Sequence, residues 1–214
     1  MPSWTLDDAD EIAAAHPYTF YKPSGAVIDR VAVGENVKLV FRFEHDDPEA
    51  PAAERMWVLV DSIDGAGGFT GRLDNEPFWI RDLKVGDPVS FRACNIVATR
   101  HDEPDNLPAR YAKRCFVTRR VLDDGMKAGF LYREAPERDG DSGWRITADD
   151  ESGAYMDDPR NVAFVSLGRV LSKDDSIVHL LDEPIGAAFA RDPATGRFVA
   201  ARSPVPEPGG DAAP

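Results

Sequence analysis

The chain has 214 residues, and 38 Asp and Glu against 25 Lys and Arg give it a formal net charge of −13 with histidine neutral. A surface this acidic repels phosphate backbones, which argues against nucleic-acid binding and favours a basic protein partner. Apolar residues make up 43% of the sequence, and this share indicates a packed, folded protein rather than a disordered polyanion.

The N-terminal segment does not resemble an export signal. Residues 7–11 contain four acids where such a signal would carry an apolar run after its cations. No apolar stretch approaches the ~20 residues that a bilayer span requires. Cys94 and Cys115 lie within strand-like runs, so we expect both to be free, buried thiols rather than nucleophiles. A cytoplasmic protein that does not bind membranes is therefore expected.

Residues 1–105 are expected to form a β-rich domain with one N-terminal helix. Residues 5–15 predict that helix, with Thr5 or Asp7 as its cap, because acids in the first turn suit the helix dipole. Alternation over residues 37–43 predicts a half-buried strand whose apolar side chains share one face: Val37, Leu39, Phe41 and Phe43.

Further apolar runs in this half predict a hairpin and another strand. The hairpin joins residues 56–60 to residues 69–73 through a glycine-rich turn, and Trp57 is its expected core anchor. The other strand covers residues 89–93, where apolar and polar side chains alternate again. Residues 101–108 are polar, which is typical of a connector between domains.

Residues 110–202 are expected to form a second domain, followed by a disordered tail over residues 203–214. Ser172 is predicted to cap a short helix, and Phe189 and Phe198 to flank a closing hairpin. The predicted fold class is α+β, with two small domains that are each a mostly antiparallel sheet with one or two short helices. The other strands predicted in the second domain cover residues 115–122, 128–132, 144–147 and 161–167.

Neither a metal site nor a catalytic motif is apparent in the sequence. The four histidines are far apart, and the glycine-rich segment 65–71 joins two strands instead of opening a helix, as a dinucleotide loop would. Residues 139–143 resemble the start of a calcium loop, but Trp144 occupies the position where its glycine belongs. We therefore expect no cofactor, no metal and no enzymatic activity.

A recognition surface is predicted between residues 144 and 161. This stretch combines aromatic side chains with dense carboxylates, a combination that suits a cationic protein partner. Five cations within residues 110–120 are expected to face the five acids within residues 149–158 across the second domain. The predicted partner-binding residues are Trp144, Asp149, Asp150, Glu151, Tyr155, Asp157, Asp158 and Asn161.

Five motifs, within a region of about residues 113–199, resemble the immunity-protein family numbered thirty-three, which is associated with bacterial polymorphic toxin systems. The motifs lie at residues 113–122, 129–134, 141–145, 155–161 and 184–191. Residues 1 to about 100 resemble a bacterial domain of unknown function that often precedes that family, through the motifs at residues 17–20, 37–41, 54–58 and 73–77.

The resemblance implies a cytoplasmic protein that neutralises a cognate toxin by binding it, without catalysis. The residues that match the family motifs are Gly143, Trp144, Tyr155, Asp157, Asp158 and Asn161. Two other functions fit the composition. One is an enzyme that uses scattered carboxylates, with or without a divalent metal, and the other is a general cytosolic adaptor.

Overall fold

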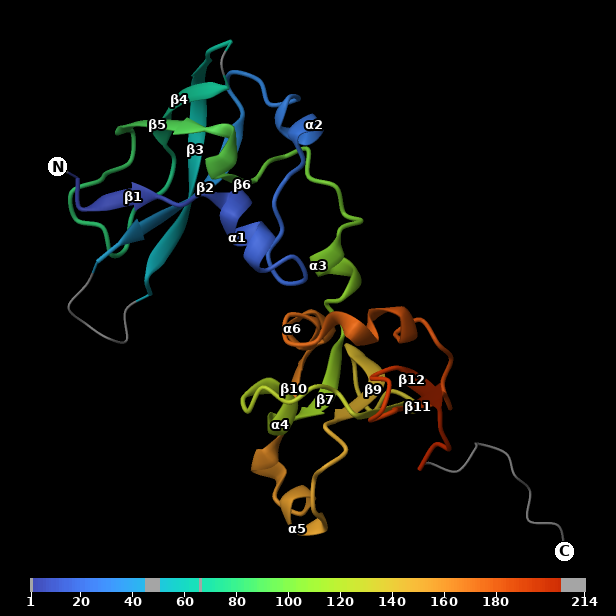
Figure 1. The fold of residues 1–214 in the computed structure, drawn as a ribbon. Helices are drawn as coiled ribbons and strands as arrows, with labels where there is room; N and C mark the ends of the chain where they lie inside the picture. The colour runs from blue at the N-terminus through green and yellow to red at the C-terminus, as the bar shows by residue number, and fades with distance from the viewer. Residues whose placement is uncertain (1, 45–50, 66, 205–214) are drawn as a thin grey trace, which may run out of the picture. The chain divides into compact units, whose positions relative to one another are not determined.

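The computed structural model describes residues 2–44, 51–65 and 67–204. The chain divides into two compact units, Met1–Asn106 and Leu107–Pro214, and each is described by itself below (Figure 1). The fold class predicted from the sequence is confirmed, since both units are built on mostly antiparallel sheets with short helices. Most of the tail predicted to be disordered, from residue 205 onward, lies outside the described residues.

The first unit is a six-stranded antiparallel sheet. The strand order is β1-β2-β3-β4-β5, and β6 pairs with β2. The strands are β1 (Trp4–Leu6), β2 (Asn36–Phe43), β3 (Ala53–Ile63), β4 (Gly68–Leu73), β5 (Pro88–Arg92) and β6 (Ile96–Ala98). The helices are α1 (Ala9–Ala15), α2 (Gly25–Ile28) and the 3-10 turn η1 (Ala93–Asn95).

Alternation along β2 builds the core of the first unit. Val37, Leu39, Phe41 and Phe43 are all buried, as the sequence pattern predicts. Val40 is buried as well, because it packs on the opposite side with Ala9 of α1. The predicted hairpin is also present, since β3 pairs with β4.

Two predictions for the first unit are wrong in detail. The helix begins at Ala9 and is capped by Asp8, whose carboxylate accepts from the backbone N–H groups of Asp10 and Glu11. Residues 4–6 form β1 instead, because their backbone pairs with β2. Trp57 does not anchor the core. It is half-buried on the other side of β3, where the Lys38 ammonium lies 4.6 Å from its ring centroid.

The second unit is a six-stranded mixed sheet with the order β10-β7-β9-β8-β11-β12, in which only β7 and β9 pair in parallel. The strands are β7 (Arg114–Thr118), β8 (Phe130–Arg133), β9 (Asp141–Thr147), β10 (Val162–Ser166), β11 (Ala188–Arg191) and β12 (Phe198–Ala200). The helices are α3 (Leu107–Arg110), α4 (Arg119–Leu122), α5 (Gly153–Met156), α6 (Leu167–Leu171) and the 3-10 helices η2 (Pro159–Asn161) and η3 (Asp175–Leu180).

One face of the second sheet forms the core of this unit. Cys115, Leu131, Trp144 and Ile146 have at most 1% of their surface exposed. Helix α6 packs against η3 and β10, and the Trp144 indole N–H donates to the carbonyl of Leu181, which follows η3. The predicted hairpin around Phe189 and Phe198 is present as β11 and β12.

Helices replace two parts of the strands predicted in the second unit. The run over residues 115–122 is a strand only to Thr118, and α4 follows, because an apolar run of this length suits either structure. Likewise, Leu167 opens α6 instead of ending a strand. The helix predicted after Ser172 starts later and is capped by Asp174, whereas Ser172 ends α6. In the described part of the chain, no helix is long and apolar enough to cross a membrane.

Candidate functional site

The face of the second sheet opposite its core carries a different set of side chains. Phe116 on β7 is paired with Arg145 on β9, and Arg145 with Tyr132 on β8. Phe164 on β10 is paired with Phe116, and the two ring centroids are 4.8 Å apart. Arg145 is buried, whereas the three aromatic residues are half-buried. These four residues form a row across the sheet, which we call the aromatic face.

A bulge in β9 sets the geometry of this face. Between Arg114 and Phe116 the register shifts: a step of two residues along β7 corresponds to a step of four along β9, from Asp141 to Arg145. In a regular strand, the Cα atoms of residues four apart are separated by about 13 Å. The long Arg145 side chain reaches back along the bulged strand, and its guanidinium lies 3.0 Å from the Asp141 carboxylate.

Gly143 makes the bulge possible. Its φ is +83°, and a Cβ at this position would lie 2.2 Å from the carbonyl oxygen of Glu134. Its N–H donates to the Asp141 carboxylate at 2.8 Å, and its carbonyl accepts from the Glu134 N–H at 2.9 Å. Only glycine fits a left-handed backbone this close to another strand. The Gly143 backbone thus positions both Asp141 and Glu134 beside Arg145.

Arg145 is the centre of an ion-pair network. Its guanidinium pairs with Glu134, with Glu137 at 3.1 Å and with Asp141, whose side chain is completely buried. It also lies 4.6 Å from the ring centroid of Phe116. Burial by itself raises the pKa of Asp141, but hydrogen bonds from Arg145 and from the N–H groups of Glu137 and Gly143 outweigh it and hold this pKa below its usual value.

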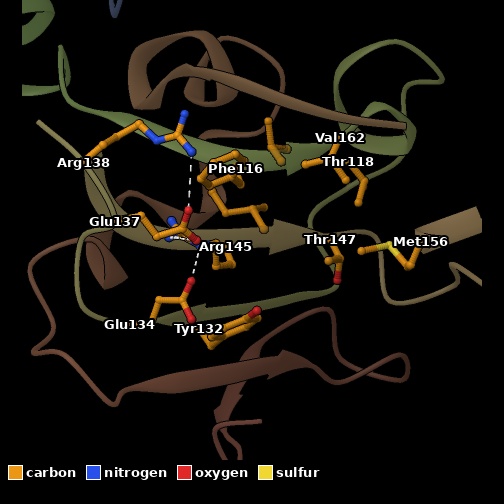
Figure 2. A pocket seen from close by; sticks show the side chains of 12 residues that line it. Phe116, Thr118, Tyr132, Glu134, Glu137, Arg138, Arg145, Thr147, Met156 and Val162 are labelled. Atoms are coloured by element: carbon orange, nitrogen blue, oxygen red, sulfur yellow. Dashed lines mark hydrogen bonds and ion pairs between the residues drawn. The ribbon is translucent and has the colours of Figure 1, made fainter. Parts of the chain in front are cut away.

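A hollow of about 470 Å³ lies on the aromatic face, within the size range of ligand sites. Figure 2 shows Glu134, Glu137 and Arg138 at one end of it and Thr147 and Met156 at the other. The complete lining is Phe116, Val117, Thr118, Tyr132, Glu134, Glu137, Arg138, Arg145, Ile146, Thr147, Met156 and Val162. An apolar floor with charged groups at its edge can hold a side chain that has both characters.

Trp144 does not belong to this hollow, and the prediction that it anchors a partner is wrong. Its side chain is completely buried in the core, on the opposite face of β9 from Arg145. Alternation along a strand sends neighbouring side chains to opposite faces, so only one of the pair could lie on the open face. Its indole N–H is also satisfied within the unit, by the carbonyl of Leu181 at 3.2 Å.

Most of the predicted acidic residues have partners inside the second unit. Asp150 pairs with Arg120, so the basic and acidic stretches do meet, as the segregation of charge predicts. Glu151 accepts from the Thr118 hydroxyl and from the Ala148 N–H, which ties it to the wall of the hollow. Asp158 caps η2 and pairs with Arg160 at 2.7 Å.

The remaining predicted residues fall into two groups. Tyr155 and Asn161 are half-buried, and the Asn161 amide donates to the Tyr155 carbonyl at 2.8 Å, which fixes the turn between α5 and η2. Asp149 and Asp157 are exposed, and neither has an ion-pair partner among the described residues. Asp157 follows Met156, which lines the hollow.

Sequence reasoning missed the residues of the aromatic face. Phe116 stands between the buried Cys115 and Val117, so the alternation of β7 already indicates that it points away from the core. The position of Arg145 between Trp144 and Ile146 likewise indicates that Arg145 points away from the core, because its apolar neighbours point into the core. The network that surrounds Arg145 gives no such signal, because Glu134 and Glu137 come from the loop after β8.

The two thiols are poorly suited to nucleophilic chemistry. Burial raises the pKa of Cys115 to about 12, and the negative charge of Asp141 contributes. Burial and the nearby Asp8 also raise the pKa of Cys94. At neutral pH both side chains therefore stay in the thiol form, which is the less reactive one. Among residues 2–44, 51–65 and 67–204, no three His, Cys, Asp or Glu side chains are grouped so that they could hold a metal ion.

Comparison with known families gives a match within the second unit. Residues 115–202 match the family described as the immunity protein Imm33 domain. This match confirms the resemblance that the sequence motifs give over residues 113–199, and it includes all of the aromatic face. No curated protein and no solved structure matches the chain. Residues 115–202, within the second unit, are therefore similar to the Imm33 immunity protein domain.

Proposed function

We propose that the chain binds a cognate toxin in the bacterial cytoplasm and neutralises it without catalysing a reaction. The observation that carries this proposal is the match of residues 115–202 to an immunity protein domain. An immunity protein protects the cell that makes it, so a direct complex with the toxin is the simplest mechanism.

The charge of the chain supports a basic partner. A net charge of −13 attracts a cationic protein over a distance of several ångströms and increases the rate of encounter. Such steering weakens as salt is added, because the Debye length falls to about 8 Å at physiological ionic strength. A toxin that binds nucleic acid would carry the complementary positive charge, because cationic side chains hold phosphate backbones.

The proposal is tested by co-expression. A toxin gene that neighbours the gene for this chain is first sought in the genome, and its toxin domain is expressed in a sensitive host, with or without the full chain. We expect the chain to restore growth, and an inactivated toxin serves as the control for expression load. Continued killing, with both proteins soluble and abundant, would show that this chain does not neutralise that toxin.

The stoichiometry of protection separates binding from catalysis. Purified chain is titrated against a fixed amount of active toxin, and the residual toxin activity is measured. A binding mechanism gives protection that is complete only when the chain is at least equimolar with the toxin. Full protection at a tenth of that amount would mean that the chain turns over, and the non-catalytic part of the proposal would be abandoned.

A further inference from the structure

The two terminal strands of the first sheet, β1 and β5, line a hollow of about 630 Å³. Neighbours in the order β1-β2-β3-β4-β5 are all antiparallel, so β1 and β5 run in the same direction (Figure 1). The hollow is also lined by Phe69 and Phe91, whose rings stack with centroids 5.2 Å apart, and by Trp4 and Leu6 of β1. It is therefore an apolar slot between two parallel strands, and among the described residues neither of them has a second strand beside it.

Main-chain groups along both edges of this slot face into it. In an antiparallel pair, the N–H and C=O of alternate residues point to the partner strand, and those of the residues between them point away. The Asp7 N–H donates to β2, so the N–H and C=O of Leu6 point away from β2. The Ala93 N–H donates to the residue that precedes β4, so the N–H and C=O of Ser90 point away from β4. Both Leu6 and Ser90 line the slot.

One amide group already bridges the two edges. The side-chain oxygen of Asn95 accepts from the Arg92 N–H of β5 at 2.8 Å, and its NH₂ donates to the carbonyl of Asp7, directly after β1, at 2.9 Å. The two ends of this amide thus point to opposite edges, as the C=O and N–H of a peptide group in a strand between β1 and β5 would. At this end of the slot, the two edges are therefore as far apart as one amide group can span.

We propose that the slot between β1 and β5 binds an extended segment of another polypeptide, which continues from the Asn95 amide and pairs with both strands in the antiparallel sense. Main-chain donors and acceptors on both walls match a peptide backbone, as when a bound peptide adds a strand to a sheet. Every second side chain of the segment points toward Phe69 and Phe91, so apolar side chains are expected at those positions. This inference concerns the first unit alone, and it does not depend on the binding of a toxin.

The first test uses the full chain and a panel of short capped peptides in which threonine alternates with valine, leucine or phenylalanine. Amide hydrogen exchange is followed by NMR, without peptide and at a saturating concentration of each one. We expect at least one peptide to slow exchange of both the Leu6 and the Ser90 amides by ~10-fold. The Val89 amide already pairs with β4 and should not change. If no peptide slows both amides, the inference is overturned.

The second test removes one main-chain donor from the peptide and leaves the protein unchanged. N-methylation of the central residue of the tightest-binding peptide keeps its side chain but removes an N–H that pairs with a strand edge. We expect the dissociation constant to rise by ~10-fold, because the partner carbonyl loses its hydrogen bond. Unchanged affinity would mean that side chains alone hold the peptide, and pairing of the main chains would be abandoned.

The third test removes a donor from the edge of β5. Ser90→Pro deletes an N–H that does not pair with β4, and Pro88 already occupies the equivalent position two residues earlier. Ser90→Ala keeps the N–H and is the matched control. We expect Ser90→Pro to weaken peptide binding by ~10-fold and Ser90→Ala by less than about twofold. Equal affinities of the two variants, with both shown by urea denaturation to be folded, would contradict pairing with β5. The N-methylated peptide tests the same pairing if the proline variant does not fold.

Discussion

The two faces of the second sheet are built by the same strands, yet they differ in what their side chains do. On the core face, Cys115, Trp144 and Ile146 are fully buried against α6 and η3. On the aromatic face, their neighbours Phe116 and Arg145 surround a hollow and an ion-pair network. The core face is closed by packing within the unit, whereas the aromatic face combines a buried ion-pair network with a partly exposed hollow. Residues adjacent in sequence can thus differ completely in role.

The largest expected effect comes from the core face. Trp144→Ala removes a completely buried indole and should lower the free energy of unfolding by about 4 kcal/mol. Tyr132→Ala, on the half-buried aromatic face, should lower it by only about 1–2 kcal/mol. Urea denaturation of both variants measures the difference. Equal losses would mean that the aromatic face is as much a part of the core as Trp144.

The bulge in β9 is tested at Gly143. Gly143→Ala should destabilise the unit by about 3 kcal/mol, because alanine must adopt a left-handed backbone and its Cβ would meet the Glu134 carbonyl. Gly140→Ala is the matched control. Gly140 also has a positive φ, but no atom lies within 4 Å of its Cβ position, so a loss of about 1 kcal/mol is expected. If thermal denaturation showed the same loss of stability for both glycine variants, the close approach of the Gly143 Cβ to the Glu134 carbonyl would be excluded as the cause.

The ion-pair network predicts how stability depends on pH. The pKa of Asp141 is lowered in the folded state, so the unfolded chain binds its proton more readily. The contribution of Asp141 to the free energy of unfolding is therefore fully present above about pH 5. It is lost as the pH falls through the pKa that Asp141 has in the folded state. Asp141→Asn should flatten the acid side of the stability curve, as measured by urea denaturation between pH 2 and pH 6. Asp139→Asn, at an exposed position, should leave that slope unchanged.

The smallest effect is expected where the acidic and basic stretches meet at the surface. Asp150→Asn removes an exposed ion pair with Arg120. Asp124→Asn removes a second ion pair of the same guanidinium, in which the Asp124 carboxylate lies 3.2 Å from Arg120. Solvent screens both pairs, so each variant should unfold at nearly the wild-type urea concentration. A large decrease in the free energy of unfolding for Asp150→Asn, but not for Asp124→Asn, would show that the ion pair between Asp150 and Arg120 holds the turn after β9 in place.

Local patterns in the sequence predicted a large part of the fold. The buried positions of β2, the hairpin of β3 and β4, and the closing pair β11 and β12 all agree with the structure. Errors arose at the ends of elements, such as α4 and the cap of η3, because short apolar runs and neighbouring polar residues suit more than one structure.

The sequence did not locate the hollow. The density of acids over residues 149–158 is a property of composition, and none of these acids is among the residues that line the hollow. Trp144 was misassigned because an aromatic residue beside charges reads the same whether it lies in the core or on the surface. Burial is decided by which face of β9 the side chain occupies, and the alternation of Trp144, Arg145 and Ile146 along β9 is the signal for that face.

The sequence by itself determined the α+β class, the acidity of the chain and the motifs of the Imm33 domain, because each of these depends on residue types and short spacings. Only the tertiary structure decided that Arg145, Asp141 and Glu134 form one network beside a row of aromatic rings. That network depends on a strand register and on a backbone bulge, and these arise from contacts between segments that are separate in the chain.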